Sequence, residues 1–458
     1  MEYLSTRNKK LSFNFKEIFL RGLAPEGGLF IPKNIKRYNK SEIQKLSKLS
    51  YTDLAIEIIF EFCNPEINKN ILRNLIKKSY KDFNKKEVID IKKLGNINLI
   101  ELYHGPTLAF KDIAMQVLGN MYDELNISSS NKINIVVATS GDTGSAAIAA
   151  LNDRKNINVF VLHPHNKISK IQRKIMTTIG SSNVYNIAIK GTFDDCQKIV
   201  KEMFADNTFR EKINMSGVNS INWARIVCQI VYYFYSYFKF NNKKVNFVVP
   251  TGNFGDVFAG YVAKKMGLPI DKLIVATNEN DILERVINTG EYKPGKVKPS
   301  LSPSMDVQIS SNFERLLFYV LNEDDKKVLR FMNDLKSKGS FSLNQEQIDI
   351  IKEDFSAKKI NDDETVEIIK KFSNDYGFII DPHTATAVGA SKVIKDNSEI
   401  LVLGTAHPYK FLETVKMATS QEIETPKQIE HLMDKKEKYD ILENKTTDIK
   451  NYILEKLS

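Results

Sequence analysis

Three segments of the chain share one pattern, in which an apolar, β-branched run is followed by a glycine-containing loop and then by a helix-like stretch. They are INIVVATSGDTGSAAIAAL (133–151), VNFVVPTGNFGDVFAGYVAKKMG (245–267) and EILVLGTAHPYKFLETV (399–415). Continuous apolar runs are typical of strands buried on both faces, and alternation of strand and helix is typical of parallel sheets. The pattern therefore predicts an α/β fold built on doubly wound, mostly parallel sheets.

The rest of the chain is divided around these segments into three predicted domains. Residues 1–95, which carry a Gly/Pro-rich turn at 22–32, are expected to form an N-terminal accessory domain. Residues 96–215 are predicted to form a smaller α/β domain, and 216–458 a larger one with a polar, helical insertion around 321–372. Because ligands bind beyond the carboxyl ends of parallel strands, we expect a site built from loops that are distant in sequence.

Composition excludes several classes of protein. The net charge of +10 is spread over lysines interleaved with acidic residues, so we predict no nucleic-acid partner but a field that attracts small anions. No stretch reaches the ~18 apolar residues of a membrane span, and the apolar segment 226–240 is expected to be a core helix. Three scattered cysteines favour a reducing, cytoplasmic location, and the histidines lack metal-binding spacing, so no metal site is predicted.

The loop PTGNFGD (250–256) is the first candidate for chemistry. Gly252 and Gly255 permit a tight turn between strand and helix, where free amide groups suit an oxyanion such as phosphate. It matches neither a Walker loop nor a G-x-G-x-x-G fingerprint. An ordinary turn, with Asp256 as an early helix residue, is the alternative.

The loop TSGDTGSA (139–146) follows the same logic with more hydroxyl groups. Hydroxyls and free amides together can bind a carboxylate or a phosphate. The residues concerned are Thr139, Ser140, Gly141, Thr143, Gly144 and Ser145. A simple helix cap, provided by Asp142 or Thr143, is the alternative.

Lys111 lies in AFKD, just before a predicted helix at 112–122. The helix dipole, together with desolvation by Leu108 and Phe110, predicts a lowered pKa for this lysine. A neutral amine is what Schiff-base chemistry requires. The alternative is a surface lysine whose apolar stem lies under a loop.

Two further segments carry weaker candidates. Arg225 in NSINWAR suits bidentate contact with an anion, although a structural ion pair would explain it equally well. The segment 302–317 offers Ser304, Asp306 and Arg315, for which caps and salt bridges are the alternative.

Taken together, these motifs resemble the threonine synthase family, whose members are fold-type-II pyridoxal-phosphate enzymes. The similarity runs in order from residue 22 to residue 411. The stretches that carry it include GLAPEGGLFIP, ELYHGPTLAFKD, ATSGDTGSAAI, VNSINWAR, VVPTGNFGDVFAGYVAKKMGLP, DPHTA and TAHPYKF.

The resemblance implies roles for individual residues. Lys111 would hold pyridoxal 5'-phosphate as a Schiff base, and Thr405 would hydrogen-bond the pyridine nitrogen. Arg225 would bind the substrate phosphate. The residues implied to hold the cofactor phosphate are Gly252, Asn253, Phe254, Gly255 and Asp256. Those implied to bind the substrate carboxylate are Ser140, Gly141, Asp142, Thr143 and Gly144.

The implied reaction converts O-phospho-L-homoserine and water to L-threonine and phosphate by γ-elimination and β-addition of water. A phospho-lyase that releases 2-oxobutanoate from the same substrate is one alternative, because it would share the lysine and the phosphate loop. A cofactor-free binding protein that keeps the anion loops is another. The expected assembly is a monomer or a homodimer.

Overall fold

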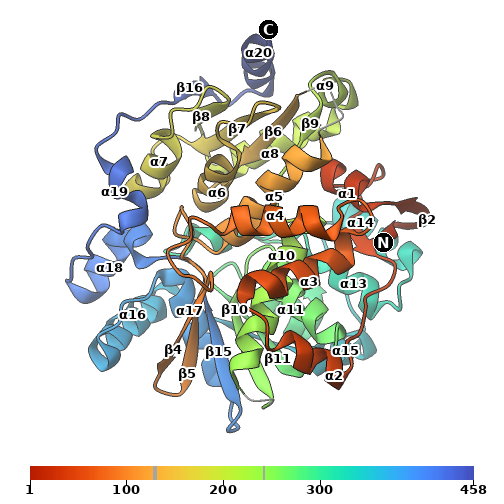
Figure 1. Ribbon diagram of the computed structural model, residues 1–458, viewed down its shortest axis with the longest axis vertical. Coiled ribbons are helices and arrows are strands. Elements are labelled where there is room, and N and C mark those ends of the chain that lie inside the picture. The colour runs from red at the N-terminus through yellow and green to blue at the C-terminus, as the bar shows by residue number, and fades with distance from the viewer. Residues whose placement is uncertain (127–131, 241–242) are drawn as a thin grey trace.

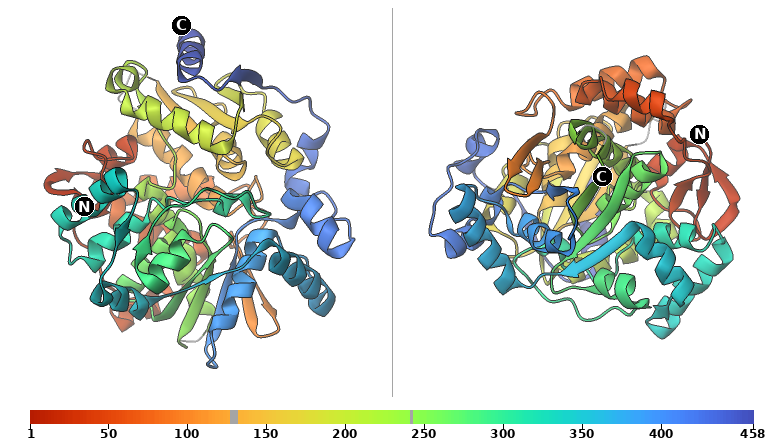
Figure 2. Two further views of the ribbon diagram at one scale, coloured as in Figure 1. Left: turned by 180° about the vertical axis from the view of Figure 1, so that it is seen from behind. Right: turned by 90° about the horizontal axis from the view of Figure 1, so that it is seen from below.

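The computed structural model describes residues 1–126, 132–240 and 243–458, and its framework is a pair of sheets at opposite ends of the molecule (Figure 1). The six-stranded sheet has the order β14-β11-β10-β15-β5-β4, and the five-stranded sheet has the order β16-β8-β7-β6-β9. The two sheets also lie apart when the molecule is seen from behind (Figure 2).

The strands of both sheets are mainly parallel. In the six-stranded sheet only β4 runs antiparallel to its neighbour, and all pairs in the five-stranded sheet are parallel. The predicted α/β class with parallel sheets is therefore confirmed. The six-stranded sheet comprises β4 (Asp90–Leu94), β5 (Ile97–Glu101), β10 (Val245–Pro250), β11 (Ile270–Thr277), β14 (Phe355–Lys359) and β15 (Glu399–Gly404). The five-stranded sheet comprises β6 (Ile133–Ala138), β7 (Ile157–Pro164), β8 (Val184–Lys190), β9 (Met215–Ser216) and β16 (Asp440–Glu443).

The helix α10 (Trp223–Tyr237) lies in the middle of the molecule, and every one of its residues is buried (Figure 1). It packs against α3, α5 and α11. The bounds of these helices are α3 (Tyr51–Cys63), α5 (Lys111–Leu125) and α11 (Gly255–Lys265). The prediction that the apolar segment 226–240 is a core helix is confirmed, and among the described residues no helix has both the length and the apolar character that a membrane crossing needs.

Other helices cover the outer faces of the sheets. α17 packs on β10, β11 and β15, with α16 and α18 beside it, whereas α8 packs on β6 and β7 and α20 packs on α8. Near the five-stranded sheet, α6 packs against α5 and α7. Their bounds are α6 (Asp142–Leu151), α7 (Lys170–Thr177), α8 (Phe193–Ala205), α16 (Asp362–Tyr376), α17 (Pro382–Ala390), α18 (Leu412–Thr419) and α20 (Thr446–Leu457).

The N-terminal region contains a small antiparallel sheet that the sequence analysis did not predict. Strands β1, β2 and β3 pair in the order β2-β1-β3, and the helices α2 and α3 that follow are separate because Ser50 caps the start of α3. The elements are β1 (Tyr3–Ser5), β2 (Asn8–Phe13), α1 (Phe15–Arg21), β3 (Phe30–Pro32), α2 (Lys40–Leu46) and α4 (Lys69–Ser79).

The strand pairing departs from the predicted ranges at three places. β4 and β5 both join the six-stranded sheet, although the boundary at 95 separated them. β16, near the C-terminus, joins the five-stranded sheet instead. The predicted helical insertion contains β14, which adds an edge strand to β11. The predicted insertion at 321–372 contains α14 (Asp325–Lys338), β13 (Phe341–Ser342), α15 (Gln345–Asp354), β14 and most of α16, and it is preceded by α12 (Ile282–Thr289), β12 (Glu291–Tyr292) and α13 (Phe313–Val320).

Candidate active site

The candidate site lies where loops from both sheets meet. Lys111 follows β5, the loop 251–254 follows β10 and Thr405 follows β15, all at carboxyl ends of strands in the six-stranded sheet. Asp142 follows β6 of the five-stranded sheet. The expectation of a site built from distant loops at strand ends is confirmed for these segments.

The turn before Lys111 is held by Asp112. The Asp112 carboxylate accepts hydrogen bonds from the Thr107 backbone N–H at 2.8 Å and from the Thr107 hydroxyl at 2.6 Å. A Cβ on Gly105 would lie 2.7 Å from Asp112 Oδ2 and nearer still to Asp112 Cβ, so this close approach requires a glycine. Leu108 adopts a left-handed conformation with φ of 60°, which is uncommon for a bulky residue and is typical of strained functional turns.

Backbone hydrogen bonds join this turn to the segment after β15. The Phe110 N–H donates to the Thr405 carbonyl at 2.9 Å, and the His407 N–H donates to the Leu108 carbonyl at 3.0 Å. Lys111 then begins α5, whose N-terminus has no side-chain cap. Lys111 and Thr405 are therefore brought together although they lie far apart in sequence.

The Lys111 amine is almost completely buried and contacts two polar side chains. Its Nζ lies 3.1 Å from Asp142 Oδ2 and 3.2 Å from Ser304 Oγ, and the side chain is 10% exposed. Burial lowers the pKa of Lys111; Asp142 raises it, and the charges of Lys410 and Arg225 lower it further. The predicted direction is thus confirmed, and of the charged residues that modify it, Asp142 and Arg225 were already site candidates whereas Lys410 was not.

The loop 139–144 uses one of its hydroxyl groups to stabilise itself. Thr139 Oγ1 accepts hydrogen bonds from the backbone N–H groups of Gly141 and Gly144, both at 2.9 Å. Gly141 has φ of 134°, a conformation that favours glycine. Ser140 and Thr143 are half-buried.

Asp142 does not cap α6, as one alternative proposed, because its carboxylate faces other elements. Oδ1 accepts from Lys410 at 2.6 Å and from Gln172 at 2.9 Å, and Oδ2 accepts from Lys111 and Ser304. Burial alone would raise the pKa of Asp142, but the charges of Lys111 and Lys410 hold it well below its usual range. Asp142 is therefore an ionised carboxylate at the centre of a buried polar cluster.

The loop 251–256 ends in the first turn of α11. The residue that adopts the left-handed conformation is Phe254, with φ of 62°, and not one of the two glycines from which the sequence analysis derived the turn. Gly252 is needed for a different reason, since a Cβ there would lie 2.8 Å from the Ser304 carbonyl oxygen. The carbonyl oxygen of Asn253 accepts from the backbone N–H and the side chain of Asn312, which fixes the loop.

The Asp256 side chain points into the core. Its Oδ1 accepts from the hydroxyls of Tyr232 at 2.5 Å and Tyr233 at 2.9 Å, both on α10. Burial raises the pKa of Asp256 to about 6, and the tyrosine hydrogen bonds oppose that rise. Any contact of this residue with phosphate would therefore come from its backbone N–H group.

Arg225 and Thr405 are both buried beside this cluster. Arg225 lies in the first turn of α10 and donates from Nη1 to the Val218 carbonyl at 3.2 Å, while its Nε has no partner within the described residues. Burial lowers the pKa of Arg225 to about 10. Thr405 is 4% exposed, and its carbonyl group is bound by Phe110.

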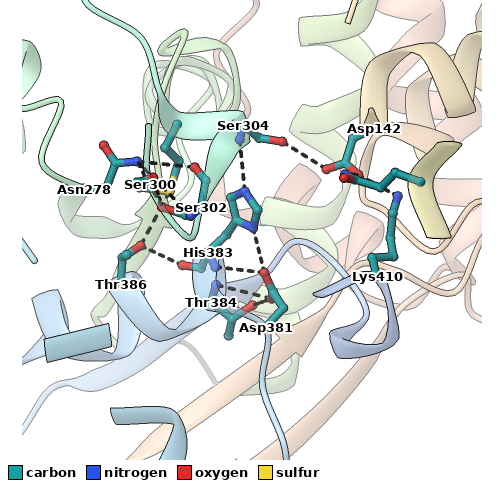
Figure 3. A network of polar contacts seen from close by, with 12 residues as sticks. Asp142, Asn278, Ser300, Ser302, Ser304, Asp381, His383, Thr384, Thr386 and Lys410 are labelled. Carbon is teal, nitrogen blue, oxygen red and sulfur yellow. Dashed lines mark hydrogen bonds and ion pairs between the residues drawn. The ribbon is translucent and has the colours of Figure 1, made fainter. Parts of the chain in front are cut away.

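The structure adds Lys410 and His383, which the sequence analysis left out of the site, and it brings in Ser304, which was offered only as a weaker candidate. Lys410, in the 3-10 helix η4 (Pro408–Phe411), contacts Asp142, and Ser304, in η2 (Pro303–Met305), contacts Lys111 and Asp142. His383 accepts from the Ser304 backbone N–H at 3.2 Å through Nε2, and its Nδ1 lies 2.8 Å from Asp381 (Figure 3). The sequence contains a feature that could have identified Lys410 as a site candidate. It is a lysine among apolar residues in PYKF, just as Lys111 is in LAFK.

A separate group of possible metal ligands lies near the start of the turn. Donor atoms of Asp90, Glu101 and His104 lie within 4.8 Å of one another. Lys92 pairs with Glu101 at 3.0 Å and Lys85 pairs with Asp90 at 2.7 Å, so the carboxylates already have cationic partners. This arrangement is an ion-pair network in which only Glu101 and His104 are buried, and it gives no support to a metal centre.

The residues of the site fit pyridoxal phosphate. The desolvated Lys111 amine suits carbonyl capture, and amide groups at the N-terminus of α11 suit a phosphate. Gly252 keeps the space beside Ser304 free of a Cβ, and Ser304 contacts Lys111, so the loop and the lysine are neighbours. The unpartnered Nε of Arg225 adds a buried donor for an anion.

Comparisons with known proteins point to one family. Family models match residues 2–80 (threonine synthase N terminus), 92–334 (pyridoxal-phosphate dependent enzyme) and 384–453 (threonine synthase, C-terminal). Threonine synthase of Pseudomonas aeruginosa is 41% identical over 99% of this chain and 98% of its own, and that of Saccharomyces cerevisiae is 42% identical over 100% and 98%. The crystal structure of a PLP-bound threonine synthase from Brucella melitensis superposes with a TM-score of 0.95 at 41% identity, covering 100% of this chain and 99% of the other.

Proposed function

The chain belongs to the threonine synthase family of fold-type-II, pyridoxal-phosphate-dependent enzymes, and we propose that its substrate is O-phospho-L-homoserine, which it converts with water to L-threonine and phosphate. The observation that carries this proposal is the buried Lys111 amine with a lowered pKa, which lies between Asp142 and Ser304. The basic net charge of the chain favours a doubly anionic phosphate ester.

The proposed cofactor contacts follow from the loops. Backbone N–H groups of Gly252, Asn253, Phe254, Gly255 and Asp256 would hold the cofactor phosphate, as the N-terminus of a helix favours an anion. The hydroxyl of Thr405 would hydrogen-bond the pyridine nitrogen. When bound, pyridoxal phosphate supplies an electron sink that stabilises negative charge at the α-carbon of the substrate.

The proposed substrate contacts come from the other side of the cluster. The loop of Ser140, Gly141, Asp142, Thr143 and Gly144 would bind the substrate carboxylate through its amides and hydroxyls. Arg225 would bind the phosphate ester, since its buried guanidinium has a donor to spare.

Lys111 is the proposed proton carrier. Its neutral amine removes the proton from the α-carbon and then one proton from the β-carbon, after which the bond between the γ-carbon and the phosphate oxygen breaks and phosphate leaves. A proton is then added at the γ-carbon, the oxygen of water is added at the β-carbon in place of the hydrogen lost there, and a proton returns to the α-carbon. The γ-carbon becomes the methyl group of threonine, so the atoms balance.

The test uses the purified holoenzyme. We expect a visible absorption band that is absent in Lys111→Ala and retained in Lys416→Ala, whose side chain is 70% exposed on α18. With O-phospho-L-homoserine, we expect stoichiometric threonine and phosphate from the wild type. Phosphate accompanied mainly by 2-oxobutanoate would identify a phospho-lyase instead, and the absence of any band would refute the proposed role of Lys111.

Three coarser expectations remain predictions. They are the cytoplasmic location, the monomeric or homodimeric state and the division at about residues 95 and 215 into three domains. The strand pairing departs from this division. β5, from the range 96–215, joins the six-stranded sheet, and β16, from the range 216–458, joins the five-stranded sheet.

A further inference from the structure

A second lysine lies beside the candidate active site, and it is more deeply buried than Lys111. Lys410 is 0% exposed, and its Nζ contacts Asp142 Oδ1 at 2.6 Å (Figure 3) and the Thr107 carbonyl oxygen at 2.9 Å. The Thr107 carbonyl belongs to the turn that precedes Lys111. Lys410 therefore connects both sides of the cluster.

Asp142 is the acid that both amines share. Lys111 binds Oδ2 and Lys410 binds Oδ1, so one negative charge faces two ammonium groups if both are protonated. Two like charges in a buried cluster repel strongly, because the local dielectric constant is low. The cluster is consequently more stable when one of the two lysines is neutral.

Other charged groups near the amines increase this imbalance. Arg225, on α10, adds positive charge beside Lys111, and His383, on α17, lies close enough to affect Asp142. Asp112, the neighbour of Lys111, is engaged by Thr107, and burial raises its pKa to about 6. Above about pH 6 Asp112 is therefore mainly ionised, and its charge favours the protonated form of Lys410.

Contact lengths distinguish the two lysines. Ion-paired N–H groups bind carboxylates at about 2.7–2.9 Å. The 2.6 Å contact of Lys410 is slightly shorter than this range, and its second acceptor is a carbonyl oxygen. Lys111 has a longer contact of 3.1 Å and, as its second partner, a hydroxyl group that can itself donate to Asp142.

We propose that Lys410 keeps its proton and that its buried charge holds Lys111 as the neutral amine. Lys410 is then a positioning residue, which acts on the cofactor and the substrate through Lys111. The direction of the Lys111 pKa agrees with this assignment: burial lowers it first, and Lys410 lowers it further against the opposing effect of Asp142. The inference rests on the proposed role of Lys111 as the lysine that binds pyridoxal phosphate.

The experiment measures cofactor capture rather than turnover. The full-length protein is freed of cofactor by dialysis against an amine scavenger, pyridoxal phosphate is added over a series of pH values, and the rate at which the visible band appears is recorded. Removing a like charge at this range raises the pKa of an amine by about 1–2 units. We expect Lys410→Met to shift the midpoint of the rate profile upward by that amount, and Lys410→Arg, which retains the charge, to leave it near the wild-type value.

Two further variants complete the test. Asp142→Asn removes the charge that favours protonated Lys111, so the midpoint should move to lower pH. Lys416→Met removes an exposed charge on α18 and should change nothing. An unmoved midpoint in Lys410→Met, or the same upward shift in Lys410→Arg, would overturn the proposal.

Folding is checked by circular dichroism. If Lys410→Met does not fold, the proposal is tested with Asp142→Asn. A midpoint that stays or rises in that variant contradicts the arrangement in which Lys111 and Lys410 share the Asp142 carboxylate. A wild-type protein that never develops the band would refute the role of Lys111 itself, whereas a wild-type band with unshifted variants would refute only the role of Lys410.

Discussion

Replacing Gly105 by alanine tests whether the turn before Lys111 is fixed by close packing. The new Cβ would lie 2.7 Å from Asp112 Oδ2, which is well inside ordinary van der Waals contact. Asp112 cannot move away freely, since its carboxylate accepts two hydrogen bonds from Thr107. Either the turn stays strained or these hydrogen bonds break.

The strained turn and the broken hydrogen bonds would cost a similar amount of free energy. Overpacking of a buried site typically costs about 1–3 kcal/mol, and loss of hydrogen bonds to a buried charged group lies in the same range of about 1.5–3 kcal/mol. If the strain falls on the conformation that places Lys111 for the cofactor, the dissociation constant for pyridoxal phosphate should rise by about 5- to 150-fold. If it falls on the fold as a whole, the melting temperature should drop.

The assay is an absorption titration of cofactor-free protein with pyridoxal phosphate, together with a thermal melt. Gly180→Ala is the matched control, because its Cβ would meet no atom within 4 Å. We expect Gly105→Ala to differ from this control in at least one of the two measurements. Equal affinity and equal melting temperature in both variants would refute the close-packing argument.

Two other substitutions test the second loop. In Gly252→Ala the Cβ would lie 2.8 Å from the Ser304 carbonyl oxygen, so the affinity for pyridoxal phosphate in the same titration should fall by about 5- to 150-fold. In Gly255→Ala the nearest contact of the Cβ would be 3.4 Å, so the affinity should fall by less. Because the folded pKa of Asp256 is raised from 3.8 to about 6, folding favours its protonated form, and the stability this confers below pH 4 is lost as pH rises through 6. At about 1.36 kcal/mol per unit, wild type should lose roughly 3 kcal/mol more than Asp256→Asn between pH 4 and pH 8 in denaturant unfolding, and parallel curves would count against the shift.

The segments with local signals were predictable from the sequence. The strands and helices β6–α6 and β10–α11 lie where β-branched runs, glycine loops and alanine-rich stretches indicated them. Continuous apolar strands identify a parallel sheet because both faces must be covered. The motifs at Lys111 and Gly252 could also be found from the local sequence. Lys111 is a charged residue directly after apolar ones, and Gly252 lies in a glycine-containing loop directly after an apolar strand.

Features that depend on tertiary contacts were not predictable. The tight turn after β10 was attributed to Gly252 and Gly255, because glycine adopts unusual backbone conformations without strain, yet the residue with the left-handed conformation is Phe254. β14 lies in a polar, helix-rich part of the sequence and becomes a strand only through pairing with β11. Lys410 and Asp142 meet across two sheets, and no spacing in the sequence records that contact.

The pKa of Lys111 shows which part of a correct direction came from the local sequence. The helix start and desolvation by Leu108 and Phe110 predicted a lowered value, and the structure gives the same direction mainly through burial. The charges that modify it belong to separate parts of the fold: Asp142 follows a strand of the five-stranded sheet, whereas Lys111 and Lys410 follow strands of the six-stranded sheet. Since the energy between charges varies inversely with distance, the proton affinity of Lys111 depends on how the two sheets are placed. The chemistry of this lysine is therefore a property of the assembled fold: the sequence around it indicates that the amine is desolvated at a helix start, but not which charges face it.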